Sequence, residues 1–260
     1  MPTTLRIAFL HLAPLPGGLE SNRQLVERAV LAAAGEKADW ILTPELCVTG
    51  YDFTPRIGTD WILPQPDAWM TGFARLAARL KVTVFLAHPE RDPQTDLLHN
   101  SLFVIGPEGA ILGRHCKIHV LRVGAESWSR RGGRVAPVLL PAPRIPVGLL
   151  ICADAFDPAI ALRLRAGGAQ LLVSAANWAP GLHGPEGEWE RCSHVTGLPL
   201  MVCNRTGMDR KLDFTGAESV VAKEGRRLLS FSAERSAMLV VQWDLDTQDF
   251  ASPDHRKLYL

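Results

Sequence analysis

Ile145-Pro146-Val147-Gly148-Leu149-Leu150-Ile151-Cys152 is an apolar run of strand length that ends on a thiol. A short continuous run of this kind is typical of a strand that is buried on both of its faces. After it, the residue pattern predicts a helix over about Pro158–Ala166 and a further strand over Leu171–Ala175. The order strand, helix, strand favours a sheet with helices packed on its face.

The chain before this run shows the same order. Three apolar runs predict strands: Leu5–Leu12, Trp40–Thr43 and Val82–Ala87. We expect a first helix with Ser21 as its N-cap and Gly35 near its end, because small polar residues cap helix starts and glycine often follows helix ends. A second helix is predicted over Asp67–Leu80, where large apolar residues recur at helical spacing.

Hairpin signals appear from the middle of the chain onward. Gly106-Pro107-Glu108-Gly109 is a turn sequence between the strand-like runs Ser101–Ile105 and Ala110–Lys117. A helix is predicted over Glu188–Val195. Four further strands are predicted: Leu200–Cys203, Glu218–Ala222, Arg227–Phe231 and Met238–Asp244. The tail after Asp246 shows neither the helix period nor the strand period.

Both halves share a loose strand–helix–strand order followed by a hairpin, and no Pro/Ser-rich linker separates them. We therefore expect an α/β protein in which residues 1–260 form a single domain. Two mixed sheets should face each other, with helices on the outside.

Composition excludes several classes of function. The net charge of +1 gives no overall field that would attract nucleic acid or an anionic membrane. Without a secretory signal or an apolar run of about 20 residues, the expected location is the cytoplasm. The odd number of cysteines, 5, and the lack of a C-x-x-C pair argue against a disulfide framework and a zinc site. We expect no metal.

Three chemically different side chains follow or end strand-like runs: Glu45, Lys117 and Cys152. Ligand sites in α/β sheets form at the carboxyl ends of strands. A thiol has an ordinary pKa of about 8.5, so it needs a nearby base or cation to act as a nucleophile at neutral pH. Glu45 would accept the thiol proton, and Lys117 together with the N–H of Ala153 would stabilise an oxyanion.

Other catalytic arrangements have less support. A Cys–His pair would use His88, His119 or His194, and the sequence leaves this alternative open, although none lies in a recognisable protease motif. The G-x-S-x-G, G-x-x-x-x-G-K-[ST] and G-x-G-x-x-G motifs are absent, so serine hydrolase, ATP and dinucleotide chemistry have no support. A binding or assembly scaffold that retains these residues is the alternative from a different class.

Three segments resemble the catalytic segments of the nitrilase, or carbon–nitrogen hydrolase, superfamily, in the same order. They are Thr43-Pro44-Glu45-Leu46, Gly113-Arg114-His115-Cys116-Lys117-Ile118-His119 and Gly148-Leu149-Leu150-Ile151-Cys152-Ala153-Asp154. The resemblance implies an α-β-β-α sandwich, a Glu-Lys-Cys triad, no cofactor and a homodimer or higher oligomer. The tail from about residue 247 is then expected to be extended and to take part in dimer contacts.

The same resemblance extends to secondary markers. These are Glu90-Arg91, Asn100-Ser101, Ser174-Ala175-Ala176-Asn177-Trp178 and Asn204-Arg205-Thr206-Gly207. Many members carry a second glutamate near the lysine, and Glu126 matches that place. It would position Lys117 and the substrate. Tyr51, Ala153, Asn177 and Trp178 are expected to bind substrate, and Trp189 is a further candidate for an apolar pocket wall.

Departures from the family pattern bear on the substrate. Ala153 replaces a larger residue beside the nucleophile, which widens the pocket, and Asp157-Pro158-Ala159 replaces a motif that carries an acidic contact. The form Cys152-Ala153-Asp154 resembles amide and carbamoyl hydrolases rather than nitrile-specific members. The favoured substrate is a carboxamide, cleaved through a thioester with loss of ammonia or an amine. An N-carbamoyl hydrolase is the runner-up, followed by a nitrilase and then an acyl transfer enzyme.

Overall fold

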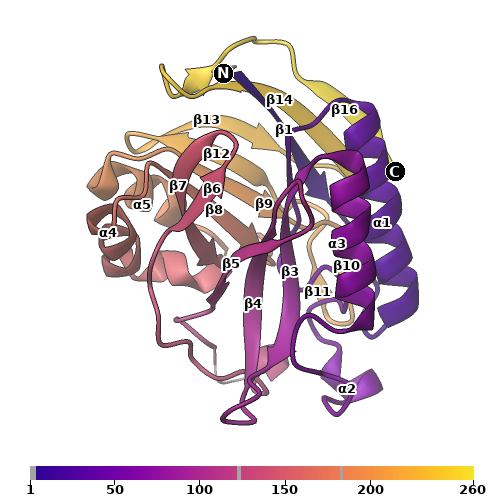
Figure 1. Cartoon of the computed structure of the whole chain (residues 1–260). Helices are drawn as coiled ribbons and strands as arrows, with labels where there is room; N and C mark the ends of the chain where they lie inside the picture. Colours follow the sequence, from indigo (N-terminus) through magenta and orange to yellow (C-terminus); the bar gives the residue numbers. More distant parts are fainter. Residues whose placement is uncertain (1–3, 122–123, 182–183) are drawn as a thin grey trace.

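In the computed structural model, which describes residues 4–121, 124–181 and 184–260, two mixed β-sheets lie face to face between two pairs of helices (Figure 1). The expected α-β-β-α sandwich is therefore confirmed. Successive side chains of strand β1 (Thr4–His11) point to opposite faces of the sheet, and both faces are buried, which explains why its apolar run is continuous. Leu5, Ile7 and Phe9 belong to the core between the sheets, whereas Ala8 and Leu10 belong to the core beneath the helices.

The larger sheet has 8 strands and contains β1 near one end. In spatial order they are β15 (Asp249–Phe250), β14 (Ala237–Asp244), β1, β2 (Trp40–Leu42), β3 (Thr83–Arg91), β4 (Leu98–Ile105) and β5 (Ile111–Cys116), with β16 (Arg256–Tyr259) also paired to β14. Strands β1, β2 and β3 are parallel, and the flanking pairs are antiparallel.

The second sheet has 6 strands. Their order is β13 (Arg226–Phe231), β12 (Ser219–Lys223), β9 (Leu200–Asn204), β8 (Leu171–Ala176), β7 (Arg144–Ile151) and β6 (Val138–Pro141). Its centre, β7-β8-β9, is parallel. A separate small ribbon pairs β10 (Met208–Asp209) with β11 (Leu212–Asp213).

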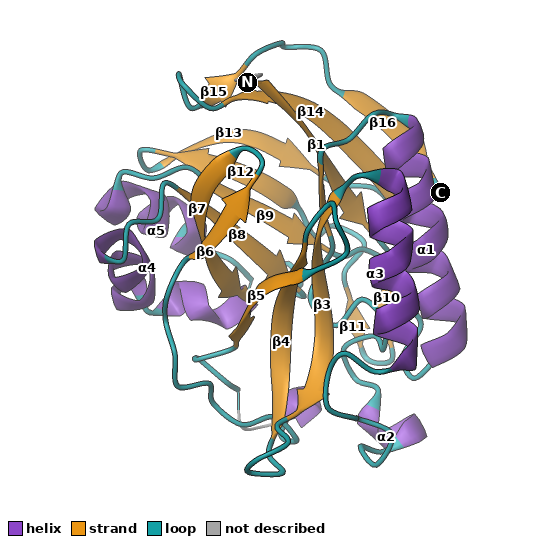
Figure 2. Cartoon of the chain, in the orientation of Figure 1, coloured by secondary structure: helices purple, strands orange, loops and turns teal. Residues whose placement is uncertain are grey.

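Helices α1 (Leu19–Gly35) and α3 (Ala68–Leu80) cover the larger sheet, and α4 (Pro158–Ala166) and α5 (Glu188–Thr196) cover the smaller one (Figure 2). The short helix α2 (Thr54–Ile57) lies at one end of the molecule, and two 3-10 turns, η1 (Gly124–Glu126) and η2 (Cys152–Phe156), lie in loops. Within the described chain, no helix combines the length and the apolar character needed to cross a bilayer.

Helix starts were predicted with mixed success. Asp67 caps α3 by accepting a hydrogen bond from Met70 N at 2.8 Å, as a short polar N-cap residue does. The prediction of Ser21 as the N-cap of α1 was wrong, because the helix begins two positions earlier. A turn in which Gly18 N donates to Leu15 O at 3.0 Å starts the helix, and Ser21 lies in its first turn.

Three strand regions were not predicted: the tail strands, β6 and the short β10–β11 ribbon. The tail after Asp246 shows no side-chain period, yet β15 and β16 both pair with β14, because main-chain hydrogen bonds at a sheet edge do not depend on side-chain alternation. Strand β6 pairs with β7 through a tight turn, and its four residues are too short a segment for a period to be recognised.

Candidate active site

The three residues of the predicted triad come from strand ends of both sheets. Glu45 follows β2 and Lys117 follows β5 in the larger sheet, whereas Cys152 follows β7 in the smaller one. Two hydrogen bonds join the sheets at this point. Glu45 N donates to Ala176 O at 3.3 Å, and Asn177 N donates to Glu45 Oε2 at 2.9 Å.

Lys117 lies between two carboxylates in a fully buried cluster. Its Nζ is 2.7 Å from Glu45 Oε1 and 2.8 Å from Glu126 Oε1. Asn100 Nδ2 donates to the same two carboxylates, at 2.7 Å and 2.9 Å. All four side chains are 0% exposed, so these contacts are shielded from solvent. Glu126 is therefore part of the cluster and not a solvated loop residue.

The charges of the cluster determine the protonation of Lys117. Burial alone would lower the pKa of Lys117, but the negative charges of Glu45 and Glu126 outweigh burial and hold it well above its ordinary value. Lys117 is therefore a permanent cation at neutral pH. Burial and the charge of Glu45 raise the pKa of Glu126, although Lys117 opposes this.

Cys152 is the first residue of η2 and has a left-handed backbone, with φ of 45°. Non-glycine residues adopt this conformation rarely, and it is concentrated at functional sites. Burial and then the charge of Glu45 raise the pKa of the Cys152 thiol well above its usual value, while Lys117 lowers it. The thiol is therefore protonated at rest, and attack requires a base to remove its proton.

Asp154 fixes the turn that carries the nucleophile candidate. Its Oδ1 accepts Ile118 N at 2.9 Å and His119 N at 2.7 Å. Its Oδ2 accepts Ile151 N at 2.9 Å and lies 2.8 Å from His115 Nε2. Burial would raise the pKa of Asp154, but His115 and these N–H donors lower it. One carboxylate thus joins the segment of Lys117 to the segment of Cys152.

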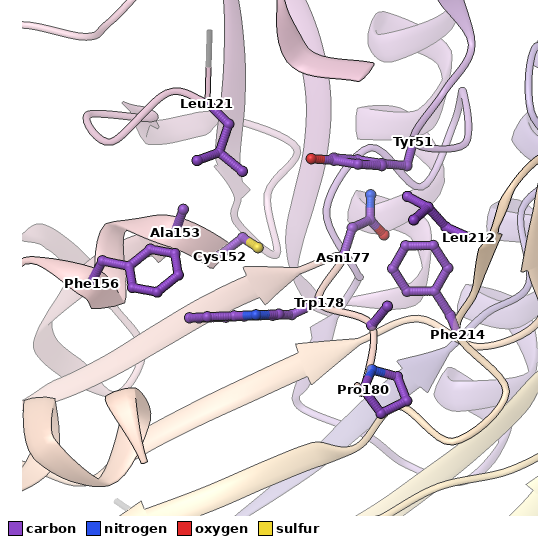
Figure 3. A pocket seen from close by; sticks show the side chains of 11 residues that line it. Tyr51, Leu121, Cys152, Ala153, Phe156, Asn177, Trp178, Pro180, Leu212 and Phe214 are labelled. Carbon is purple, nitrogen blue, oxygen red and sulfur yellow. The ribbon is translucent and has the colours of Figure 1, made fainter. Parts of the chain in front are cut away.

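A cavity of about 540 Å³ opens beside Cys152 (Figure 3). Its described lining is mostly apolar and consists of Tyr51, Leu121, Cys152, Ala153, Phe156, Asn177, Trp178, Ala179, Pro180, Leu212 and Phe214. The four expected substrate-binding residues all belong to it: Tyr51, Ala153, Asn177 and Trp178. Trp189 does not; it is fully buried and packs edge-on against Trp178, with ring centroids 5.4 Å apart.

One wall of the cavity comes from the β10–β11 ribbon and is held by a buried ion pair. Asp209 pairs with Arg205 and also accepts Tyr51 N at 2.8 Å, so it ties the Tyr51 loop to the ribbon. The guanidinium of Arg205 lies 4.6 Å from the centre of the Phe214 ring. The sequence did not indicate Leu212, Phe214 and Asp209 as site residues, and its only signal for this wall was the marker segment that contains Arg205.

The histidines of the alternative Cys–His pair have other contacts. His88 stacks on Trp69 with ring centroids 5.7 Å apart. His194 lies against Gly225, and the His119 ring packs on Phe156. The charged groups that act on the Cys152 thiol are Glu45, Lys117 and Glu126.

Three residues at or beside the segments that resemble the family have defined contacts: Asp157, His115 and Cys116. Asp157 caps α4, since its side chain accepts Ala159 N at 3.0 Å. His115 binds Asp154, as described above. Cys116 donates to Glu90 Oε1 at 3.3 Å, and Glu90 also accepts Ser101 Oγ at 2.6 Å. Burial raises the pKa of Cys116 to about 11, so this thiol is not activated.

Known proteins resemble this chain over most of its length. It is 24% identical over 247 residues to a probable nitrilase of Schizosaccharomyces pombe, with 92% of this chain and 89% of the relative covered. It is 27% identical over 239 residues to a nitrilase of Pyrococcus abyssi, with 88% and 86% covered.

Solved structures share the fold. A carbon-nitrogen hydrolase from Helicobacter pylori G27 superposes with a TM-score of 0.79 at 20% identity, covering 95% of this chain and 91% of that one. A mutant of the amidase from Nesterenkonia sp. AN1 in complex with butyramide gives 0.77 at 22% identity, covering 93% and 92%. The family model for carbon-nitrogen hydrolases matches residues 6–251, and with this match the chain belongs to the carbon-nitrogen hydrolase family of the nitrilase superfamily.

Proposed function

We propose that this protein hydrolyses the carbon–nitrogen bond of a small carboxamide with an uncharged acyl group. The observation that carries the proposal is the buried cluster of Glu45, Lys117 and Glu126, whose charges act on the Cys152 thiol at one wall of an apolar cavity. A thiol, a carboxylate and a permanent ammonium together supply a nucleophile, a proton carrier and an oxyanion donor.

In the first half-reaction, Glu45 takes the proton of Cys152 as the sulfur attacks the amide carbon and a C–S bond forms. The carbonyl oxygen becomes an oxyanion that Lys117 and the N–H of Ala153 stabilise. When this intermediate collapses, the C–N bond breaks and Glu45 returns the proton to the departing nitrogen, so ammonia leaves. Cys152 then holds the acyl group as a thioester.

In the second half-reaction, water attacks the thioester carbon and Glu45 accepts a proton from the water. Collapse breaks the C–S bond, and the sulfur recovers its proton from Glu45. The products are a carboxylic acid and the regenerated thiol. One carboxylate serves both half-reactions because its Oε2 is fixed by Asn177 N, while its Oε1 accepts from Lys117 and Asn100.

The lining of the cavity favours uncharged substrates. None of its described residues carries a formal charge, whereas an N-carbamoyl amino acid would bring a carboxylate that needs a cationic partner. Tyr51, Asn177 and the indole nitrogen of Trp178 contribute polar side-chain atoms near Cys152, and the other described walls are mainly aliphatic or aromatic. A plain carboxamide fits these walls better than an N-carbamoyl amino acid does.

Nitrile hydrolysis is the second candidate, because the two relatives from Schizosaccharomyces pombe and Pyrococcus abyssi are called nitrilases. The same thiol and cluster would attack a nitrile carbon. The amidase neighbour favours an amide, since its mutant was solved in complex with butyramide.

Ammonia release from butyramide, butyronitrile and N-carbamoylglycine tests the proposal. The highest kcat/KM should be for butyramide, and Cys152→Ala should abolish it. Iodoacetamide followed by peptide mapping supplies the control, because this reagent is itself a small carboxamide. It should label Cys152 before Cys116. Turnover of butyronitrile or N-carbamoylglycine in preference to butyramide would contradict the proposal.

A further inference from the structure

The side-chain amide of Asn177 is buried without a hydrogen-bond partner. The residue is 5% exposed, yet neither its Oδ1 nor its Nδ2 has a partner in the described structure. Asn204 shows the ordinary situation close by: its Oδ1 accepts Trp178 N at 3.0 Å and its Nδ2 donates to Trp178 O at 2.9 Å. A buried polar group without a partner destabilises a fold, so such groups are exceptional in native structures.

This amide lines the cavity beside the reactive thiol. The main-chain N–H of Asn177 donates to Glu45 Oε2 at 2.9 Å, which fixes the residue next to the proposed base. In Figure 3 the sulfur of Cys152 and the amide of Asn177 face the same space, with Tyr51 above and Trp178 below. An acyl group attached to Cys152 therefore lies within reach of the amide.

The two polar atoms of the Asn177 amide determine which group of a ligand can pair with it. Asn177 offers an acceptor and a donor side by side, and both are unpaired. With the oxygen and nitrogen positions exchanged, the residue would offer the same pair. A carboxylate would match only the donor. A second carboxamide on the substrate would match both atoms without bringing a charge into the apolar cavity.

We propose that Asn177 determines specificity by binding a second, neutral carboxamide group on the acyl chain, placed one carbon from the scissile carbonyl. The inference rests on the proposed hydrolysis of carboxamides and names the class of substrate, a short diamide. A site that hydrogen-bonds a substrate group discriminates strongly against an analogue that lacks it, because the protein group is then left unpaired.

Malonamide and isovaleramide form a matched pair for the test, since both have the same number of non-hydrogen atoms and differ in one carboxamide against one isopropyl group. The kcat/KM ratio of malonamide to isovaleramide is measured in wild type and in Asn177→Leu, a variant of similar side-chain size that retains the N–H bonded to Glu45. We expect wild type to prefer malonamide, and the ratio to fall at least about tenfold in the variant. Leu212→Val, which changes an apolar part of the wall, should shift the ratio much less.

A binding measurement keeps this inference separate from the hydrolysis proposal. Calorimetric titration of Cys152→Ala, with and without Asn177→Leu, compares the two amides without turnover. If wild type hydrolyses isovaleramide and the ratio is unchanged in Asn177→Leu, the role of Asn177 is refuted while the proposed function stands. If no amide is hydrolysed, the proposed function fails. In that case an Asn177-dependent preference for binding malonamide supports the inference, and equal binding overturns it. Circular dichroism and urea unfolding of Asn177→Leu confirm that the variant folds.

Discussion

The Nζ atom of Lys117 lies 2.7 Å from Oε1 of Glu45, and both side chains are fully buried. A planar guanidinium is larger than an ammonium and cannot occupy this space with the same contacts. We therefore expect Lys117→Arg to lower kcat/KM for a carboxamide at least about a hundredfold. Steady-state ammonia release measures it. Lys81→Arg, at an exposed pair with Glu108, is the matched control and should retain wild-type rates. A loss of less than about tenfold in Lys117→Arg would assign the lysine a purely structural role.

Glu45 and Glu126 contact the same ammonium but should differ in mutants. Glu45→Gln removes the proposed proton carrier, so thioester formation should collapse and intact mass should show no acyl-enzyme. Glu126→Gln retains shape and some hydrogen bonding, so turnover should fall roughly a hundredfold through misplacement of Lys117, with acyl-enzyme still formed. If Glu45→Gln accumulates acyl-enzyme as fast as wild type, the base is another residue, and Glu126 is the first to test.

Asp154 should matter for stability as well as activity. Asp154→Asn replaces one of two acceptor oxygens with a donor that faces existing donors, so we expect a loss of roughly 3 kcal/mol in the free energy of unfolding. Urea denaturation measures it, together with the rate at which iodoacetamide labels Cys152. Asp157→Asn is the control, because asparagine caps a helix about as well as aspartate does. Equal stability of the two variants would show that the Asp154 network is dispensable.

Acid should destabilise the fold through two buried histidines. Burial lowers the pKa of His11 to about 4, with Lys257 and Arg205 adding to the effect and the carbonyl of Asn204 opposing it. Burial likewise lowers the pKa of His88 to about 4; Arg23 adds to this, and the Pro89 carbonyl and Asp67 oppose it.

The unfolded chain takes up these two protons below its ordinary histidine pKa of about 6.5, whereas the folded chain does not. The stability that is present above pH 6.5 should therefore be lost as the pH falls toward 4, by about 3 kcal/mol for each histidine. Urea midpoints from pH 7 to 4.5 measure the loss. The double variant His11→Gln, His88→Gln should show a smaller loss, and equal pH dependence in the two proteins would contradict the assignment.

The buried pair of Asp209 and Arg205 should affect substrate binding more than chemistry. Asp209→Asn leaves Arg205 buried without its counter-ion and loosens the Tyr51 loop, so KM for a carboxamide should rise more than kcat falls. Steady-state kinetics separate the two effects. Asp52→Asn breaks only a partly exposed ion pair with Arg210, 3.0 Å long, and should change both constants little. A fall in kcat alone in Asp209→Asn would exclude a role in shaping the cavity.

The sequence predicted the sheets because their central strands are continuous apolar runs, and α4 was predicted with the same bounds, Pro158–Ala166. It also placed Glu45, Lys117 and Cys152 at strand ends, since a polar residue that follows an apolar run can be recognised from the sequence alone. The tail strands β15 and β16 were missed because edge pairing leaves no side-chain period. The expected homodimer stays a prediction.

The contacts between segments were harder to predict. Asn100 and Asp154 lay in recognised segments, but nothing in their spacing shows that one amide binds two glutamates, or that one carboxylate holds two loops. Leu212 and Phe214 reach the cavity about 60 positions after Cys152. Their ribbon is tied to the Tyr51 loop by Asp209, which lies 158 positions after Tyr51 in the sequence. Long-range geometry of this kind requires the folded chain.

The hydrogen bonds from Glu45 N to Ala176 O and from Asn177 N to Glu45 Oε2 place half of the site on each sheet. The reacting groups are therefore aligned only while the two layers keep their registry, and any slippage between them separates the base from the nucleophile. Enzymatic activity should consequently report on the alignment of the two layers. It should be lost at urea concentrations below those that unfold the sheets. Leu149 lies between the layers and, under selection for activity, should tolerate fewer substitutions that change side-chain shape. Val30, which is equally buried in the core beneath α1, should tolerate more.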